Sequence, residues 1–390
     1  MYVPSNPIVC EAEGNVMAER YQNYVNGSWS DGSSGAVSTS TNPADLSDVV
    51  GEFQASTSAD AAAAIDAAHD VKESWRRTSS LARGGYLLKA ASYLEANLEE
   101  FAQMVTRECG KAILESRGEI GRAVALLQYY GVEGSNPVGS VVPSVNPNIL
   151  LYTNRMPLGV VSLITPWNFP FAIPIWKMAP ALVYGNTIVL KPASATPGVA
   201  TLIARMWEAV DLPAGVFNLI TGSGATVGNE LITNDKVAAI SFTGSTRIGM
   251  NIAAESAKRG KRYQLEMGGK NPVIVLPDAD LEQAAEITVS GAMKYSGQKC
   301  TATSRAIVVG NIMEEFTNLV VEKTNALKIG AGSDPQSIIV PVIDQASKDN
   351  IASMIARGVA DGGSILAGGG VPSGNGFDKG TYVEQTVINN

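Results

Sequence analysis

Apolar and polar residues change their spacing along the chain, and the first region is typical of short strands. Alternating runs flank the turn residues Asn26-Gly27 in the stretch YVNGSW, which predicts a β-hairpin over residues 24–29. A second extended pair, residues 37–41 and 49–53, is joined by Asn42-Pro43. We therefore expect the chain to open with short antiparallel strands.

Helical spacing begins at about residue 58. An alanine-rich helix is expected from Ser58, which we predict to be its N-cap, and leucines recur on one face through residues 79–108 as a second helix. A third helix is expected over residues 111–130 and is ended by Gly131. We expect all three helices to serve as scaffold.

From residue 159 onward, short apolar runs alternate with helical stretches. This alternation predicts a parallel sheet with helices on both faces, and hence an α/β fold. A second alternation over residues 273–327 predicts a separate α/β unit, and the glycine-rich residues 362–376 are expected to form a loop. In the first alternation we expect strands at residues 159–164, 187–190, 217–220, 238–242 and 264–266, and helices at residues 171–184, 198–210, 225–232 and 247–257.

Residues 138–157 differ from both patterns, because they are extended and are interrupted by Pro143 and Pro147. The stretch is too polar for a buried sheet and too regular for a linker. We predict a protruding hairpin that contacts another subunit. The expected assembly of the full-length protein is a homo-oligomer, either a dimer or a tetramer.

Composition narrows the classes of partner. The 390 residues are 45% hydrophobic and carry 29 basic and 37 acidic side chains, with no polybasic run, so nucleic acid and anionic membranes are excluded as partners. The start lacks the features of a signal peptide and no long apolar run follows, which predicts a cytoplasmic protein. Cys10, Cys109 and Cys300 are far apart, so we expect neither a disulfide framework nor a metal site.

The chain has one histidine, His69, and it lies in a helical stretch away from any glycine turn. A Cys-His or Ser-His dyad would have to recruit it from a surface helix. Acid-base chemistry is therefore expected from carboxylates, lysine or tyrosine.

Two glycine-flanked turns offer a carboxylate and a thiol, namely Glu266 in LEMGG and Cys300 in GQKCT. Backbone in such turns can approach a ligand closely. We interpret Cys300 as a nucleophile, with the preceding Lys299 favouring its thiolate, and Glu266 as the base that activates water. The alternative is that Cys300 is a small buried hydrophobic residue.

Three upstream stretches complete the set. FTGSTRIG at residues 242–249 is a candidate phosphate cradle at a helix start, although a glycine pair there can also reflect tight packing. In VLKPASATP, Lys191 at a strand end suits ribose or phosphate, or is simply solvated. In TPWNFP, the amide of Asn168 can donate to an oxyanion or can cap the turn. Together these groups indicate aldehyde oxidation: the thiol attacks a carbonyl, hydride passes to a nicotinamide, and water releases the acid.

In this order and with these spacings, TPWNFP, VLKPAS, FTGST, LEMGGKNP and GQKCTA resemble the aldehyde dehydrogenase superfamily, over residues 24–387. The resemblance implies a Rossmann-type NAD(P)-binding domain at residues 1–137 and 157–266, an oligomerisation hairpin at 138–156 and a catalytic domain at 267–390. It also implies that Cys300 is the nucleophile and Glu266 the general base. Asn168 and the Cys300 backbone N–H would form the oxyanion hole.

The resemblance further implies where the cofactor binds. Lys191 and Ser194 match contacts to the adenosine ribose, and Gly244 and Ser245 match contacts to the pyrophosphate. Because Ser194 stands where NAD-preferring members often carry glutamate, we expect NADP to be favoured over NAD. The full set of expected cofactor residues is Thr165, Pro166, Trp167, Lys191, Pro192, Ala193, Ser194, Gly224, Phe242, Gly244, Ser245, Met267 and Gly268.

The run GQKCTATSR is most similar to semialdehyde dehydrogenases, with 2,5-dioxopentanoate (alpha-ketoglutarate semialdehyde) as the first expected substrate and succinate semialdehyde as the second. Glu266 disfavours a CoA-acylating or phosphorylating relative. The family continues beyond a run like residues 380–387 into segments that hold the nicotinamide ribose and pair with a neighbouring subunit, so we expect a C-terminally truncated member. A catalytically silent fold with a binding or structural role is the alternative.

Overall fold

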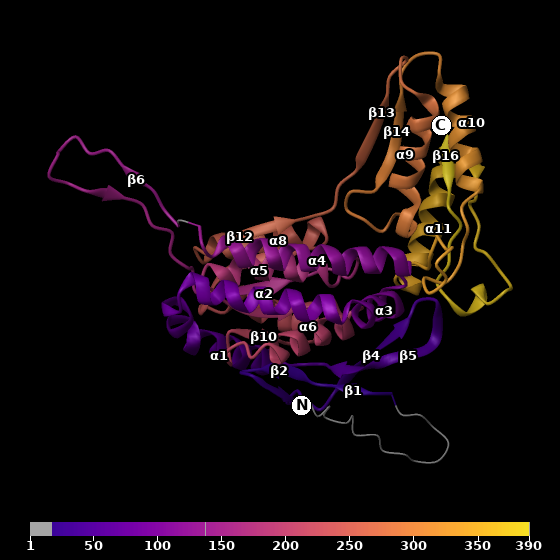
Figure 1. Ribbon diagram of the computed structural model, residues 1–390. Coiled ribbons are helices and arrows are strands. Elements are labelled where there is room, and N and C mark those ends of the chain that lie inside the picture. Colours follow the sequence, from indigo (N-terminus) through magenta and orange to yellow (C-terminus); the bar gives the residue numbers. More distant parts are fainter. Residues whose placement is uncertain (1–17, 137, 390) are drawn as a thin grey trace, which may run out of the picture.

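A computed structural model describes residues 18–136 and 138–389 (Figure 1). Its centre is a seven-stranded sheet in the order β12-β11-β8-β9-β10-β2-β3. The strands from β12 to β10 are parallel, and β2 and β3 are antiparallel additions at one edge. The expected α/β class is confirmed. The parallel strands are β8 (Val160–Ile164), β9 (Thr187–Lys191), β10 (Phe217–Leu219), β11 (Val237–Thr243) and β12 (Arg262–Glu266).

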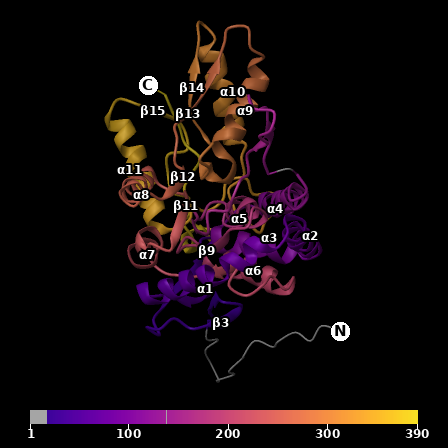
Figure 2. The same ribbon diagram turned by 90° about the vertical axis from the view of Figure 1, so that its left-hand side faces the viewer.

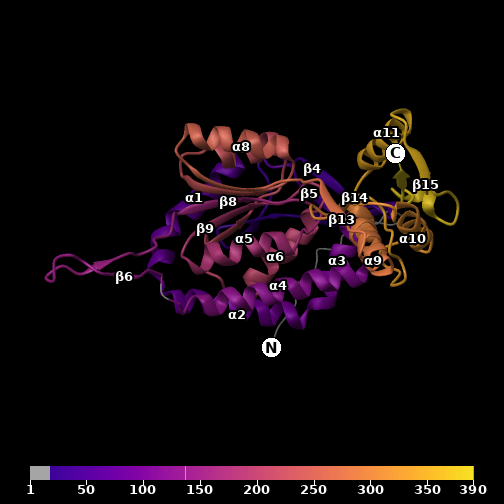
Figure 3. The ribbon, with the colours of Figure 1, turned by 90° about the horizontal axis from the view of Figure 1, so that it is seen from above.

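Helices cover both faces of this sheet (Figure 3). One face packs against α1, α7 and α8 through a cluster that includes Ile65, Leu231 and Ile252. The other face packs against α5 and α6, with α2, α3 and α4 as a further layer. The helices are α1 (Ser58–Arg77), α2 (Ser80–Ala96), α3 (Leu98–Cys109), α4 (Ile113–Glu133), α5 (Ala172–Val183), α6 (Pro197–Ala209), the π-helical turn η1 (Gly224–Gly228), α7 (Asn229–Thr233) and α8 (Thr246–Lys258).

The N-terminal strands lie where the turn residues predict them. Asn26 and Gly27 have positive φ angles of 51° and 74°, as a tight hairpin between β2 (Asn23–Val25) and β3 (Ser28–Ser30) requires. β4 (Val37–Asn42) and β5 (Asp45–Gln54) pair across Pro43, and β1 (Arg20–Tyr21) adds to β5 in parallel. Both predicted pairs are confirmed.

Three predictions in the helical region are wrong. The expected helix over residues 79–108 is two helices, because Asn97 leaves helical geometry (φ −115°, ψ 20°) and its side chain donates back to the Tyr93 carbonyl at 2.7 Å. The N-cap of α1 is Thr57 and not Ser58. Thr57 forms a capping box with Asp60. Gly131 does not end α4, because the helix runs on to Glu133. A Cβ at residue 131 would lie 2.6 Å from Leu88 of α2. This glycine therefore allows close helix packing.

A second α/β unit follows the main sheet and stands beside it (Figures 1 and 2). β13 and β14 pair in parallel and pack on α9 and α10 through Val275, Val289 and Phe316. Residues 362–376 are not wholly loop, because β15 lies within them and pairs with β16. The elements are β13 (Asn271–Val275), α9 (Leu281–Met293), η2 (Lys294–Gly297), β14 (Thr303–Val308), α10 (Met313–Asn325), α11 (Gln345–Ala360), β15 (Ser364–Ala367), η3 (Phe377–Lys379) and β16 (Val387–Asn389).

A thin two-stranded hairpin projects from the main body (Figures 1 and 3). It consists of β6 (Val141–Val142) and β7 (Leu151–Tyr152), paired antiparallel. Each helix in the described parts of the chain is too short or too polar to cross a membrane.

Candidate active site

The strand order places the upstream motifs at one crevice. From β8 the chain crosses the sheet through β9 to β10, whereas β11 and β12 lie on the other side of β8. The loops that leave the carboxyl ends of β8 and β11 therefore diverge, which opens the crevice where such sheets bind ligands. TPWNFP, KPAS, FTGST and LEMGG lie at the carboxyl ends of β8, β9, β11 and β12.

Glu266 is the last residue of β12 and its side chain is exposed. Its Oε1 accepts a hydrogen bond of 2.9 Å from Gln264 Nε2. Its carbonyl accepts from the N–H of Gly244, which ties LEMGG to the FTGST turn. The carboxylate is therefore oriented but open to solvent, as a base for water requires.

Cys300 lies between η2 and β14 and is exposed. The amide of Asn271, which follows LEMGGK directly, donates to the carbonyls of Cys300 at 2.8 Å and Ala302 at 2.9 Å. A Cβ on Gly269 would lie 3.8 Å from the Cys300 carbonyl. The carboxylate-bearing and thiol-bearing segments are thus joined, although they lie in different parts of the sequence.

The turn that leads to Cys300 is strained. Tyr295, Ser296 and Gly297 have successive φ angles of 56°, 52° and 71°, and only glycine adopts this region without cost. Ser296 Oγ bonds both the N–H and the carbonyl of Val340, and Gln298 Oε1 accepts from the N–H of Ile343. The surrounding segment therefore holds the turn in place.

Cys109 is the other cysteine in the described residues, and it is fully buried. Its Sγ donates to the Val105 carbonyl at 2.9 Å, and burial raises the pKa of its thiol to about 11. A nucleophile needs the thiolate, so Cys109 is unsuited to that role.

Asn168 faces the cysteine loop. Its Nδ2 donates to the Gln298 carbonyl at 2.9 Å, which leaves the second N–H of the amide for a ligand. Its buried Oδ1 has no hydrogen-bond partner within the described residues. The backbone N–H of Cys300 is also free of any acceptor there. The two expected oxyanion donors therefore come from loops in contact.

Lys299 does not direct its charge at the thiol as expected from the sequence. Its Nζ forms an ion pair with Glu115 of α4, and both side chains are about three-quarters buried. The carboxylate offsets the ammonium charge. The Lys299 side chain therefore links the cysteine loop to α4.

Lys191 ends β9 and is 5% exposed. Its Nζ donates to the neighbouring Pro192 carbonyl at 2.9 Å, and no carboxylate in the described parts of the chain pairs with it. Burial lowers the pKa of Lys191 to about 8. A buried amine without a carboxylate partner is suited to the hydroxyls or phosphate of a nucleotide. The exposed Ser194 lies nearby and its Oγ donates to the Gly222 carbonyl at 3.5 Å.

The glycines of FTGSTRIG allow neighbouring side chains to pack directly against the main chain. A Cβ on Gly244 would lie 2.5 Å from the Phe242 ring, and one on Gly249 would lie 2.6 Å from Met267 Sδ. Ser245 is the N-cap of α8, and its side chain accepts from the N–H of Ile248. The N-terminus of a helix suits an anion. Met267 packs beside Phe242.

The remaining expected cofactor residues lie in these loops, except Gly224, which starts η1 after β10. Thr165 is buried, its N–H donates to the Lys191 carbonyl, and its Oγ1 has no partner in the described residues. A Cβ on Gly224 or Gly268 would meet nothing within 4 Å, so both glycines border open space. Half-buried or buried positions are occupied by Pro166, Trp167, Pro192 and Ala193.

Sequence reasoning missed Lys177, Gln264 and Asn271. Lys177 Nζ donates to Ser241 Oγ at 2.9 Å and to Gln264 Oε1 at 3.2 Å, and Gln264 in turn holds Glu266. Burial lowers the pKa of Lys177 to about 8, against the raising effect of Glu266. The sequence does single out Lys177, because it is the one charged residue in the otherwise uncharged helix α5.

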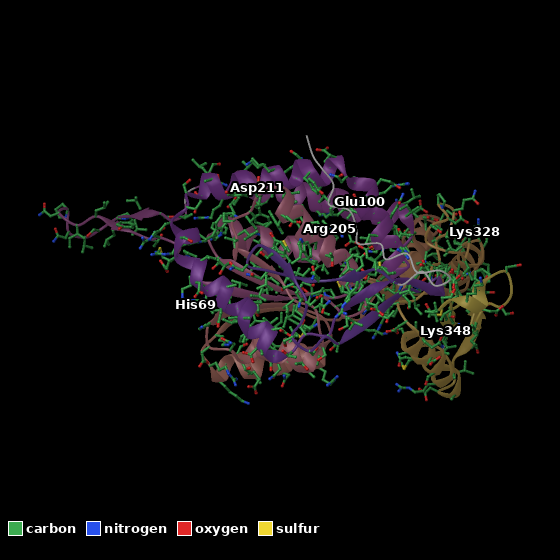
Figure 4. All side chains as sticks on the ribbon, turned by 90° about the horizontal axis from the view of Figure 1, so that it is seen from below. His69, Glu100, Arg205, Asp211, Lys328 and Lys348 are labelled. Carbon is green, nitrogen blue, oxygen red and sulfur yellow. The ribbon has the colours of Figure 1, made fainter. Side chains whose placement is uncertain are left out.

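His69 lies outside this arrangement. Figure 4 shows it on α1, away from the part of the chain that carries Lys328 and Lys348. Its ring contacts Lys72 of the same helix. The site therefore has a thiol, a carboxylate and an amide donor without an imidazole.

The family model described as "Aldehyde dehydrogenase family" matches residues 29–390 of this chain. The chain belongs to the aldehyde dehydrogenase family. Among curated relatives it is 46% identical to the alpha-ketoglutaric semialdehyde dehydrogenase of Bacillus subtilis, over 95% of this chain and 76% of the relative. It is 36% identical to the NADP(+) succinate-semialdehyde dehydrogenase GabD of Escherichia coli, over 90% of this chain and 72% of the relative.

A solved aldehyde dehydrogenase has the same fold. The betaine aldehyde dehydrogenase of Staphylococcus aureus in complex with NAD+ superimposes with a TM-score of 0.92 at 31% identity, covering 94% of this chain and 73% of that one. The protein is therefore an oxidoreductase that converts aldehydes to carboxylic acids with NAD or NADP. The expected enzyme class and cofactor class are confirmed.

Proposed function

We propose that the preferred substrate is a semialdehyde that carries a carboxylate, with 2,5-dioxopentanoate first. The observation behind the proposed mechanism is the joining of the Cys300 and Glu266 segments by Asn271, with the Asn168 amide against the same cysteine loop. The named activity of the Bacillus subtilis relative supports the choice of substrate. The Escherichia coli relative supports succinate semialdehyde as the second candidate.

The first step forms a covalent bond to Cys300. The thiolate adds to the aldehyde carbon, and the carbonyl oxygen becomes an oxyanion that accepts hydrogen bonds from Asn168 Nδ2 and the Cys300 N–H. When bound, NAD(P)+ supplies the acceptor for the hydride that leaves the substrate carbon. Loss of that hydride oxidises the carbon and leaves a thioester on Cys300.

The second step releases the acid. Glu266 removes a proton from water, the hydroxide adds to the thioester carbon, and the same oxyanion donors stabilise the tetrahedral intermediate. Cleavage of the C–S bond returns the cysteine thiolate and gives the carboxylic acid. Gln264 and the Lys177 ammonium behind it orient the base.

The cofactor residues are part of the same proposal. The buried amine of Lys191 and the unpaired Thr165 Oγ1 fit the polar groups of a dinucleotide, and the open space beside Gly224 and Gly268 leaves room for it. We propose that Lys191 and Ser194 hold the adenosine ribose, and that Gly244 and Ser245 hold the pyrophosphate. An exposed serine at residue 194 leaves room for a 2′-phosphate, which favours NADP.

We propose the domain division expected from the sequence, with residues 138–156 as an oligomerisation hairpin. Val141, Leu150 and Tyr152 on this arm are 73%, 72% and 68% exposed. We expect a second copy of the chain to pack against these apolar side chains. Sedimentation at several concentrations tests this, and a strictly monomeric chain would contradict it. A thiol nucleophile also suits a reducing compartment such as the cytoplasm.

The test of the substrate proposal is a panel of aldehydes that differ in chain length and in the presence of a terminal carboxylate. NADPH formation should be most efficient, judged by kcat/KM, with 2,5-dioxopentanoate. Equal kcat/KM for aliphatic aldehydes of the same length without the carboxylate would refute the substrate class and leave aldehyde oxidation intact.

A further inference from the structure

A buried ion pair lies behind the oxyanion donor and has no role in the steps above. Lys111 and Glu119 pair through Lys111 Nζ and Glu119 Oε2, and their side chains are 1% and 0% exposed. Lys111 follows Gly110, which ends α3 with a φ angle of 73°, and Glu119 lies in the second turn of α4. Neither side chain can be reached by solvent or substrate.

Each partner of the pair holds the TPWNFP turn. Lys111 Nζ donates to the carbonyl of Asn168 at 2.7 Å. Glu119 Oε1 accepts from the N–H groups of Phe171 and Ala172, both at 2.9 Å, where α5 begins. The main chain of Asn168 is therefore fixed on one side by a cation, while its side-chain amide points to the Gln298 carbonyl.

The same ammonium contacts the cysteine loop. It lies 3.9 Å from the centre of the Phe169 ring and 4.6 Å from that of Tyr295, the first residue of the left-handed turn that leads to Cys300. One cation thus touches both loops that supply the oxyanion donors. Cation–π contacts of this kind are strongest where the charge is desolvated.

Stability alone is a weak reason for such a pair. Replacement of a buried ion pair by apolar residues of similar size is often neutral or stabilising, because the desolvation cost offsets the attraction. Glu108 shows that a buried carboxylate can hold a helix start without a lysine, since it accepts from Gly198 and Val199 at the start of α6. The lysine at the Asn168 turn therefore calls for another explanation.

We propose that Lys111, held by Glu119, is a positioning residue that sets the Asn168 amide against the loop that carries Cys300 and so forms the oxyanion hole. This rests on the roles proposed above for Asn168 and Cys300. The lysine never touches substrate. It acts through the carbonyl of Asn168 and the ring of Tyr295.

The test needs a reaction that uses the oxyanion hole and a matched one that does not. Acylation of Cys300 by para-nitrophenyl acetate proceeds through a tetrahedral oxyanion, forms the S–acyl bond and expels para-nitrophenolate. Alkylation of the same thiolate by iodoacetamide displaces iodide at a saturated carbon and forms no oxyanion. The ratio of the two rate constants, measured without cofactor, reports the oxyanion hole separately from thiol reactivity.

We expect Lys111→Met to lower this ratio about tenfold or more, and Asn168→Ala to lower it by about a hundredfold, the usual effect of losing one oxyanion donor. In the variant with both changes, the ratio should fall no further than in Asn168→Ala, because both act through one amide. The paired variant Lys111→Met with Glu119→Gln removes the unpaired buried charge. It should regain stability without regaining the ratio.

Arg83→Met is the control for general loosening of the fold. Arg83 is buried at the opposite end of α5, where it donates to the Val183 carbonyl at 2.8 Å. This variant should lose thermal stability and keep the ratio. The proposal is overturned if Arg83→Met lowers the ratio as much as Lys111→Met, if the paired variant has the wild-type ratio, or if the effects at residues 111 and 168 multiply. A normal ratio in Asn168→Ala would instead refute the role proposed for Asn168 itself.

Discussion

Replacement of Lys191 by methionine should make the chain more stable at neutral pH. Lys191 is 5% exposed and has the Pro192 carbonyl as its hydrogen-bond acceptor. Burial lowers the pKa of Lys191 from the ordinary 10.5 to about 8, a difference of about 2.5. At about 1.36 kcal/mol for each unit of pKa, the cost of keeping this ammonium buried at pH 7 is about 3 kcal/mol.

The sign follows from proton binding. Between pH 8 and 10.5 the unfolded chain holds the proton on Lys191 and the folded chain does not, so stability rises with pH in this window. Above pH 10.5 Lys191 is neutral in both states and costs the folded chain nothing. As the pH falls through about 8, the folded chain also takes up the proton and the full cost of the buried charge is present. Lys191→Met removes this dependence, so the advantage of the variant should be largest at pH 7 and should vanish above about pH 10.

Urea denaturation of both chains at pH 7, 8.5 and 10 measures the difference. The same substitution should weaken NADP binding about tenfold or more in calorimetry, because a hydrogen bond from a charged donor is lost. A variant that is less stable than the wild type at pH 7 would refute the energetic argument. Unchanged NADP affinity would refute the assignment of Lys191 to the cofactor.

The other assigned residues give further expectations. Glu266→Gln should slow thioester hydrolysis about a hundredfold or more while the first turnover of NADPH remains, and stopped-flow absorbance that shows no burst would contradict a role limited to deacylation. Ser194→Glu should raise KM for NADP about tenfold or more with little change for NAD, because the carboxylate repels the 2′-phosphate; an unchanged ratio of kcat/KM values refutes this. In wild type, turnover should rise as Lys177 loses its proton near pH 8, because the positive charge behind Gln264 is then removed from the site. A Lys177→Met profile that keeps this rise would exclude Lys177 as its source.

Local patterns predicted the strands and the motif positions well. The Asn26-Gly27 turn and the apolar runs of β8, β9 and β11 are determined by residues close in sequence. TPWNFP, KPAS, FTGST and LEMGG each lie at the carboxyl end of a strand, whereas GQKCT lies between η2 and β14. The position of these four motifs relative to the apolar runs predicts that they meet at one edge of a parallel sheet.

What the sequence did not reveal depends on contacts between distant residues. The helix break at Asn97 interrupts a leucine pattern that continues on both sides of it, and Gly131 resembled a helix stop because its packing partner is on α2. Asn271 and Lys177 look like ordinary polar residues until the fold brings them to Cys300 and Glu266.

The sequence also did not reveal which groups its charged residues pair with in the structure. Lys299 was expected to act on the adjacent thiol, yet Glu115 of α4 takes up its charge. Lys111 gave no signal, because its acceptor carbonyl lies 57 residues away in the chain. Adjacency in sequence is therefore a poor guide to which charges interact.

The most direct test of the account is to trap the covalent intermediate. Glu266→Gln should be mixed with NADP+ and 2,5-dioxopentanoate, quenched in acid, digested and analysed by mass spectrometry. We predict a substrate-derived acyl group on Cys300, none on the buried Cys109, and one NADPH formed for each acylated site. Formation of NADPH with Cys300 unmodified would contradict the claim that this thiol is the nucleophile.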